Sequence, residues 1–542
     1  MTDSVGNSGK KPEVNEDRVG LRPAVLVVGA GPTGLLLAAE LERRGVSCHL
    51  IDALPGPLHW DRATVVHPRS LQIFESMGLA EKFLEAGCKQ RVIKVHSDGK
   101  LLGSMDLSTC GSVYGFNLGL SEEITESILT DYLVRQGGEV HRASRLVGLR
   151  PHDDGLLAAI EREGEQYEVK VRWAVGCDGL HSPTRELSGI GFDGHAIAKA
   201  WAVFDAAVKG WNDTYEGIFP FLDASPIILT ALPGQRWRVY LRPSSDDSDL
   251  VADATSTLRA NVPGASFVDV ENPTRFHCNT KVAAKFRDGA VFLAGDAAHL
   301  CTPAEGHGMN SGLQDAFNLA WKLALVHQGH AGTILLDSYE AERRPVAERI
   351  TESGDRTEHA HTTTDPAERK SRDETIIATL ADPATLHLEL AAETELNIDY
   401  SGSPIIFGDA DKALRPGNRL PDTIRVEWTD GSARRLHKLA HRRGHTLMLI
   451  AGPASDARDF VNIHAALQEA ATESPLFEAA VGVGVSRDLP VEIGYMEPAA
   501  ANLLGVEGST LFVMRPDGYI GLRADRDHLR ELKRYSALVL AG

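Results

Sequence analysis

Residues 294–312, AGDAAHLCTPAEGHGMNSG, place a carboxylate, several glycines and a proline directly ahead of an apolar helical pattern. The preceding residues GAVFLA predict a strand, so the Asp296 carboxylate follows a strand end, where it can accept hydrogen bonds from ligand hydroxyls. Gly306 and Gly308 carry no Cβ, which lets the backbone pass close to a flat ligand. A helix beginning here would point its positive end at that ligand. The segment therefore predicts a loop that wraps a bound molecule.

A second glycine cluster lies near the start of the chain, between two predicted strands. Residues 24–28, AVLVV, predict a buried strand and 47–52, SCHLID, a second one, with the helical pattern LLLAAELERRG between them. The turn after the first strand has the spacing G-x-G-x-x-G, formed by Gly29, Gly31 and Gly34. Strand, glycine turn, helix and strand in this order predict a dinucleotide-binding unit.

Each residue of this unit has a physical task. Gly29 permits a tight turn, Gly31 lets the backbone approach a pyrophosphate, and Gly34 allows close packing of helix and strand. Asp52, at the end of the second strand, would accept hydrogen bonds from a ribose. The spacing recurs in GIGFDG at 189–194, but no helical pattern follows, so we expect no dinucleotide there. This unit alone does not separate FAD from NAD.

A third segment, VRWAVGCDGLHSPTREL at 171–187, predicts a strand, the pair Asp178–Gly179 and a helix that starts at Ser182. On its own it fits any strand–turn–helix connection. With the other two segments, the chain resembles the class A FAD-dependent aromatic hydroxylases, the flavoprotein monooxygenases that include para-hydroxybenzoate hydroxylase and phenol hydroxylase. The resemblance runs from about residue 23 to 350. It rests on G-x-G-x-x-G, the Asp-Gly pair, and a Gly-Asp pair followed by P-x-x-G-x-G-x-N at 295–310.

The resemblance implies an α/β fold in three parts. These are a Rossmann-like FAD-binding domain of the glutathione-reductase type, an antiparallel-sheet substrate domain and a C-terminal thioredoxin-like domain. The expected bounds are a disordered tail at 1–22, the FAD-binding domain at 23–189 and 285–354, the substrate domain at 190–284, a helical linker at 355–405 and the thioredoxin-like domain at 406–542. No cysteine follows Cys301, which excludes thiol chemistry in the last domain. We expect that domain to be structural or to contribute to a homodimer contact.

The resemblance implies a monooxygenase that uses NAD(P)H and O2 to hydroxylate a small phenolic aromatic substrate through a flavin C4a-hydroperoxide. FAD is the implied cofactor, and the sequence leaves open whether NADPH or NADH is the co-substrate. A non-catalytic flavin-binding sensor or scaffold is the alternative from another class. A plain dehydrogenase would not need the loop at 295–310, and the W-x-W segment of flavin halogenases is absent.

The family pattern assigns candidate residues position by position. The cofactor-binding candidates are Gly29, Gly31, Gly34, Asp52, Arg62, Glu122, Asp178, Gly295, Asp296, Pro303, Gly306, Gly308, Met309 and Asn310. Arg69 matches the family pattern less well than Arg62, and for both arginines a charged helix face is the alternative. Glu122 stands where the family commonly has a glutamine, and so does His307. His307 is expected either to line the active site or to be a solvated histidine of the loop. Pro303 is expected beside the isoalloxazine ring. Helix 311–329 is expected to be capped by Asn310, or by Ser311 in a capping box with Gln314.

The catalytic candidates are His307, Pro303 and Tyr240, and the proton-relay residue is not identified by the sequence. Residues 190–284 predict strands in AWAVFDAAV, PIILTAL and RWRVYLRP. In the family such a sheet roofs the flavin. Its pocket-facing candidates are Phe219, Ile228, Thr230, Trp237 and Tyr240. The sequence does not fix the register, so for each of them we expect a place in the core, with substrate contact as the alternative.

Composition and charge limit the partners and the location that the protein can have. A net charge of −19 excludes nucleic acids and anionic membranes as partners, since both would be repelled. No apolar run reaches 18 residues and the polar start lacks a signal-peptide pattern, so neither a membrane span nor secretion is expected. Six scattered cysteines without C-x-x-C predict reduced thiols in the cytoplasm. His359 with His361 and His437 with His441 have no third ligand pattern, so we expect surface histidines and no metal site.

Overall fold

A computed structural model describes residues 23–57, 63–211, 215–490 and 492–542. The expected tail at 1–22 and the candidate Arg62 lie outside these residues. Among the helices that are described, none combines the length and the apolar character needed to cross a bilayer.

A six-stranded sheet carries the glycine-rich motifs. β1 pairs in parallel with both β2 and β12, and β12 pairs in parallel with β21. The carboxyl ends of these four strands lie at one edge, so Gly29, Asp52, Asp178 and Gly295 share that edge, as the motifs predict. The strand order is β20 (Arg287–Asp288), β21 (Val291–Leu293), β12 (Trp173–Gly176), β1 (Val25–Val28), β2 (Cys48–Ile51) and β8 (Val140–His141).

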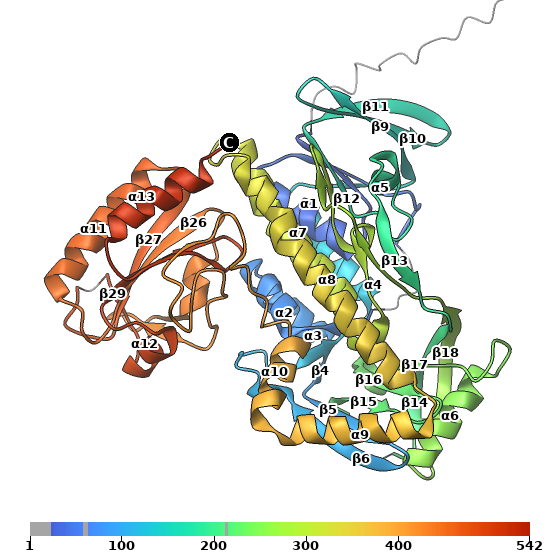
Figure 1. The fold of residues 1–542 in the computed structure, drawn as a ribbon. Coiled ribbons are helices and arrows are strands. Elements are labelled where there is room, and N and C mark those ends of the chain that lie inside the picture. Colours follow the sequence, from blue (N-terminus) through green and yellow to red (C-terminus); the bar gives the residue numbers. More distant parts are fainter. Residues whose placement is uncertain (1–22, 58–62, 212–214, 491) are drawn as a thin grey trace, which may run out of the picture.

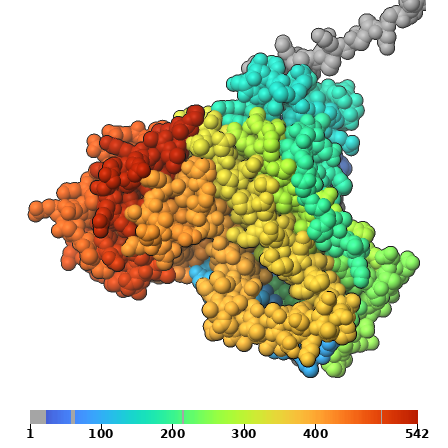
Figure 2. Space-filling view, viewed as in Figure 1, coloured from blue at the N-terminus to red at the C-terminus, as the bar shows by residue number. Residues whose placement is uncertain are grey.

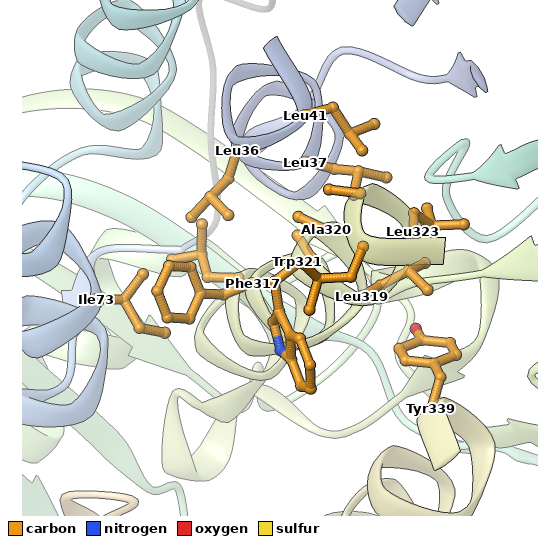
Figure 3. Close-up of a cluster of buried hydrophobic side chains, with 14 of the residues drawn as sticks. Leu36, Leu37, Leu41, Ile73, Phe317, Leu319, Ala320, Trp321, Leu323 and Tyr339 are labelled. Atoms are coloured by element: carbon orange, nitrogen blue, oxygen red, sulfur yellow. The ribbon is translucent and has the colours of Figure 1, made fainter. Parts of the chain in front are cut away.

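Helix α7 (His307–His327) forms the centre of this part of the molecule and packs against α1 (Pro32–Arg43). From Asn310 to Val326 every residue of α7 is buried, which is the pattern of a helix enclosed on all sides. Figure 3 shows Phe317, Leu319 and Trp321 of α7 among leucines of α1, with Ile73 and Tyr339 at either side. Burial of this core fixes the N-terminus of α7 against the sheet edge.

The copy of the glycine spacing at 189–194 runs into a strand, β13 (Phe192–Ala196), which confirms that no helix follows it. β13 pairs with β19 (Asn279–Ala283), and β19 with β22 (His299–Leu300). A separate three-stranded sheet, at the top of Figure 1, contains β9 (Ser144–His152), β10 (Gly155–Arg162) and β11 (Glu165–Val171).

A seven-stranded, mostly antiparallel sheet contains the strands predicted between 190 and 284. It is joined by two strands from the N-terminal part, because β15 pairs in parallel with β5. Its order is β18 (Ser266–Phe276), β14 (Trp201–Lys209), β17 (Arg236–Leu241), β16 (Ile227–Leu232), β15 (Gly217–Phe221), β5 (Val92–Ser97) and β6 (Lys100–Asp106). Helix α6 (Leu250–Asn261) packs on one face of this sheet.

Three helices follow α7 and reach back to this sheet (Figure 1). α8 (Ile334–Thr362) runs continuously through residue 354, so the domain boundary expected there falls inside a helix. α9 (Pro366–Ala381) packs against β6, and α10 (Pro383–Glu393) packs against α9. The helical character predicted for 355–405 is confirmed by these elements.

The C-terminal residues form an eight-stranded sheet, drawn in orange and red in Figure 1. Its elements follow the sequence prediction, including a hairpin that turns at Gly518 with a φ of +84°. The strand order is β23 (Phe407–Gly408), β30 (Ile520–Ala524), β29 (Ser509–Met514), β26 (His445–Ala451), β27 (Phe477–Gly484), β28 (Gly494–Tyr495), β24 (Arg425–Glu427) and β25 (Ala433–Arg435). The helices are α11 (Ala457–Glu473), α12 (Pro498–Leu504) and α13 (His528–Val539).

Candidate active site

The three glycines of the first turn occupy distinct surroundings. Gly29 has a φ of +100°, and a Cβ there would lie 2.2 Å from the carbonyl oxygen of Cys177. A Cβ on Gly34 would lie 1.9 Å from the carbonyl oxygen of Gly29. At Gly31 the nearest heavy atom to a Cβ, in Glu126, would be 3.8 Å away. Two glycines are therefore required by protein packing, whereas Gly31 leaves room for a phosphate at the N-terminus of α1.

The Gly-Asp loop packs directly on this turn. Gly295 adopts a φ of +59°, and a Cβ on it would lie 2.7 Å from Thr33 Oγ1. Gly312, one turn into α7, is under the same constraint, since its Cβ would lie 2.3 Å from that oxygen. Between Val291 and His299, Asp296 alone is exposed. Its carboxylate faces the cavity described below, where it can bind ligand hydroxyls.

The capping prediction for α7 is wrong. The helix begins at His307 after Gly306, which adopts a left-handed φ of +70°, so Asn310 and Ser311 lie inside the helix. Asn310 is fully buried, and its Nδ2 donates to the carbonyl oxygens of Val65 (2.8 Å) and Gly306 (2.9 Å). Its Oδ1 accepts from the backbone N–H of His67 (3.0 Å). Asn310 therefore joins the segment at 64–67, which contains the short strand β3 (Val65–Val66), to the loop at 303–306.

A cavity of about 900 Å³ runs from the first glycine turn to the seven-stranded sheet. This volume lies near the upper end of the roughly 300–1,000 Å³ found for ligand pockets. Of the cofactor-binding and catalytic candidates, its wall contains Gly31, Glu122, Asp296, Pro303, Gly306, Gly308, Met309 and Tyr240. Gly29, Gly34, Asp52, Asp178, Gly295, Asn310 and His307 are not part of that wall.

Two predicted ribose or cofactor ligands bind protein groups in this structure. Asp52 Oδ2 accepts from the backbone N–H of Ala30 at 2.7 Å, which fixes the glycine turn to β2. Asp178 accepts from Ser182 Oγ and from the backbone N–H of Thr184 at 2.9 Å, at the start of α5 (Pro183–Leu187). Both carboxylates thus hold the sheet edge in shape. Arg69 is buried elsewhere and donates to the carbonyl oxygen of Asp517 at 2.9 Å.

Successive side chains of a strand point to opposite faces of a sheet, so the five pocket candidates of the large sheet fall into two groups. Ile228, Thr230 and Tyr240 face the cavity. Phe219 and Trp237 face the opposite side and pack in the core beneath α6, so for these two the substrate-facing alternative is wrong. The hydroxyl oxygen of Tyr240 lies 3.2 Å from Thr64 Oγ1, which places Tyr240 where the large sheet meets the segment at 64–67.

His307 is neither a solvated loop residue nor part of the cavity wall. It is 7% exposed, and its Nδ1 lies 3.1 Å from Glu395 Oε1. Burial alone would lower the pKa of His307, but the carboxylates of Glu395 and Glu305 together raise it to about 9. His307 is therefore a buried cation behind the loop that carries Pro303.

Carboxylates from α10 and its C-terminal end were missed by the sequence analysis. Glu393 faces the cavity, and Asn117 Nδ2 donates to its Oε1 at 2.9 Å. Asn117, on β7 (Asn117–Gly119), also lies 3.2 Å from Nδ1 of the buried His67. No motif marks these residues, because they come from segments that are far apart in the chain.

The expectation of surface histidines is wrong for His437 and for His361. His437 is buried, and its Nε2 lies 2.7 Å from Glu75 Oε2. His441 lies nearby, so Glu75, His437 and His441 have the donor types of a metal site. Arg435 and Lys438 also pair with Glu75, and these cations occupy the carboxylate that a metal would need. His361 lines the large cavity.

The glycine turn, the Gly-Asp loop and the shared cavity define a nucleotide-cofactor enzyme of mixed α/β fold. Residues 22–353 match the family model described as "FAD binding domain". A 6-methylpretetramide 4-monooxygenase from Streptomyces rimosus is 31% identical over 93% of this chain and 91% of its own length. A pentachlorophenol 4-monooxygenase from Sphingobium chlorophenolicum is 34% identical over 61% of this chain and 63% of its own length.

A solved structure of aklavinone-11 hydroxylase with FAD and aklavinone is similar over 95% of this chain and 98% of its own, with a TM-score of 0.73 and 25% identity. The chain belongs to the FAD-binding family that the model describes. It is an FAD-dependent aromatic monooxygenase that uses NAD(P)H, which confirms the function expected from the resemblance. Because these relatives are enzymes, catalysis is favoured over the alternative of a flavin-binding sensor.

Proposed function

We propose that this enzyme hydroxylates a fused-ring phenolic compound. The observation that carries the proposal is the size and course of the cavity. Beyond the loop at 303–309 it continues between the large sheet, with Ile228 and Phe276, and the helices α8 to α10, with Ile376 and Leu380. Two opposing apolar walls from separate parts of the chain suit a flat, extended ring system.

The alignment lengths support a fused-ring substrate. The relative named for 6-methylpretetramide aligns along nearly the whole chain, and the aklavinone hydroxylase structure does too. The relative named for a one-ring phenol aligns over 61% of the chain. A one-ring phenol is therefore the second candidate.

The charge of the cavity wall narrows the substrate further. Among the described residues of the wall there is no lysine or arginine. The part of the wall from the loop at 303–309 onward, which we assign to the substrate and call the substrate half, instead carries the carboxylates of Glu305, Glu389 and Glu393. A carboxylated substrate would be repelled there, whereas phenolic hydroxyls can donate hydrogen bonds to carboxylates. The wall therefore suits an aromatic compound that has hydroxyls and no acid group.

The residues present fit an extended FAD. The open face of Gly31 and the N-terminus of α1 would hold the pyrophosphate, Asp296 the hydroxyls, and the loop from Pro303 to Met309 the ring system. Bound FAD would supply the electrons taken from NAD(P)H and the activation of O2. We assign Tyr240 to the orientation of a substrate hydroxyl, since it lies where the sheet and the cofactor loop meet. Pro303 stiffens the ring-binding loop, and His307 supports it from behind.

We propose that residues 406–542 form a thioredoxin-like domain without thiol function. The order β27-β26-β29-β30, with α11 after β26 and α13 after β30, supports this assignment. A reducing, cytoplasmic location remains our proposal, and it agrees with six cysteines that are all free thiols. The homodimer contact stays a prediction for this domain.

The test is a substrate panel on protein reconstituted with FAD. NADH and NADPH oxidation, O2 consumption and peroxide release are measured with aklavinone as the fused-ring probe and with pentachlorophenol as the one-ring probe. A carboxylated analogue of each controls for charge. We expect coupled hydroxylation of aklavinone and weak or uncoupled turnover of the others. Efficient coupling with the one-ring phenol alone would contradict the proposal.

A further inference from the structure

Glu393 lies at the C-terminal end of α10, and its side chain forms part of the cavity wall. Among the described residues, its one hydrogen-bond donor is Asn117, which binds Oε1 at 2.9 Å. The second oxygen is therefore available to a molecule in the cavity. Asn117 is fully buried and pairs on its other side with His67, so it fixes the position of the Glu393 carboxylate.

The surroundings of Glu393 favour proton exchange near neutral pH. Burial is the main cause that raises its pKa, and the carboxylates of Glu305 and Glu395 add to it. The His307 cation and the hydrogen bond from Asn117 act in the opposite direction, and the resulting pKa is about 7. A base with a pKa near the working pH combines a useful ionised fraction with a sufficient affinity for protons.

Two neighbours of Glu393, His307 and Glu395, keep their charges near neutral pH. His307 has a pKa of about 9 and stays paired with Glu395, which also accepts from Gln314 Nε2 at 2.6 Å. Burial would raise the pKa of Glu395, but the hydrogen bond and charge of His307, together with the charge of Arg343, lower it. Glu305 is held by Ser353 Oγ of α8 at 2.9 Å. Glu393 therefore faces the cavity beside a fixed ion pair, and its pKa of about 7 lets it gain or lose a proton near neutrality.

We propose that Glu393 is the catalytic base that removes the phenolic proton of the substrate, an assignment that rests on the proposed function. The phenolic O–H bond breaks, the proton forms a new O–H bond on the carboxylate, and the electron pair stays on the oxygen as phenolate. The phenolate carries more electron density at its ortho and para carbons, where hydroxylation takes place. Glu393 returns the proton to the phenolate of the hydroxylated product, so no proton is consumed by this step.

The experiment compares wild-type holoenzyme with Glu393→Gln, which is neutral and of the same size. Glu374→Gln is the matched control, since Glu374 is a glutamate of the neighbouring helix α9 whose exposed side chain lies outside the cavity wall. Three readouts are used: an infrared titration of protonated carboxyl groups, the visible spectrum of bound aklavinone against pH, and the pH profile of kcat/KM.

In wild type and in Glu374→Gln we expect a carboxyl group that titrates near pH 7 and a bound phenol that ionises below its pKa in water. In Glu393→Gln both features disappear, kcat falls by about 10²- to 10⁴-fold, and activity returns at a pH where the free phenol ionises. Glu393→Asp should restore part of the rate.

A Glu393→Gln enzyme that keeps the wild-type pH profile, or a carboxyl that titrates near pH 4, would overturn the assignment. If the holoenzyme hydroxylates no phenol, the proposed function fails. The infrared titration needs no turnover, so it still decides whether Glu393 has the protonation behaviour of the base.

Discussion

Glu342→Gln tests whether buried ion pairs hold the C-terminal domain against α7 and α8. The Glu342 carboxylate accepts from Lys322 Nζ at 2.7 Å and from both terminal nitrogens of Arg515 at 2.7 Å each. Asn318 Nδ2 and Ser403 Oγ donate to it at 2.7 Å and 2.6 Å. The side chains of Glu342, Lys322 and Arg515 are fully buried, so solvent cannot replace a lost partner.

Removal of one partner from a buried ion pair costs about 3–5 kcal/mol, because a charge stays behind without compensation. Glutamine keeps one acceptor oxygen but turns an N–H₂ toward Lys322 or Arg515. Arg515 still has Asp517, at 2.5 Å, whereas Lys322 loses its carboxylate partner. We therefore expect a loss of about 3–5 kcal/mol, a large part of the roughly 5–15 kcal/mol that stabilises a typical domain.

The loss of folding stability in Glu342→Gln should depend on pH. Burial lowers the pKa of Lys322 to about 8 even with Glu342 beside it. In Glu342→Gln that pKa falls further, so the folded variant binds fewer protons than the unfolded chain, and its stability rises with pH. The stability deficit of Glu342→Gln relative to wild type is therefore smaller at pH 9 than at pH 7. The lysine of the unfolded chain is charged at both pH values.

Urea unfolding, followed by circular dichroism and by release of FAD, measures the effect. Glu216→Gln is the control, because Glu216 pairs with Arg91 at 2.6 Å while both side chains are about half exposed. Such a surface pair contributes about 0–1 kcal/mol. If Glu342→Gln unfolds at the same urea concentration as Glu216→Gln, the network does not hold the domains together and the reasoning is refuted.

Three further predictions concern the site and the domain contact. Gly34→Ala should purify without flavin absorbance, since its Cβ would lie 1.9 Å from the Gly29 oxygen. Burial raises the pKa of Glu75, but hydrogen bonds from His437 and a lysine bring it to about 2. Its ionised form thus adds stability that fades as pH falls from about 4.5 toward 2, and thermal melts of Glu75→Gln should lack this part of the acid dependence. Tyr240→Phe should lower kcat/KM about 5-fold with unchanged FAD affinity, as expected for one neutral hydrogen bond.

The parts of the fold that the sequence predicted correctly are set by local patterns. Val25–Val28 form a strand because all four residues are apolar and three are β-branched valines, and Gly29 can adopt the positive φ that the turn requires. The strands and helices after residue 440 also follow local patterns, with turn residues such as Gly518 between them. Neither prediction depended on contacts with distant segments.

The start of α7 was predicted incorrectly because a local pattern competed with a distant contact. Ser311 and Gln314 have the spacing of a capping box, yet Gln314 donates to Glu395, and Asn310 binds the backbone of Val65. Those contacts favour four more residues of helix, which moves the N-terminus to His307. Tertiary contacts thus decided the boundary.

Glu393 and His437 could not be found from the sequence for a related reason. Glu393 meets Asn117 across 276 positions, and His437 meets Glu75 across 362 positions. A glutamate near a helix end and a histidine in a basic stretch look like ordinary surface residues. Their burial and partners depend on how α10 and the C-terminal domain pack, and one sequence contains no pattern that reports this packing.

The two halves of the cavity are built from different kinds of groups, and this separates cofactor binding from substrate choice. The half that we assign to the cofactor contains glycines such as Gly31, Gly179 and Gly306, where a side chain would fill open space beside the backbone. The substrate half is formed by side chains of the large sheet and of α8 to α10. Because the motifs lie almost entirely in the first half, relatives can share FAD chemistry and still accept different rings. In this protein, the base that we propose comes from a helix that carries no family motif.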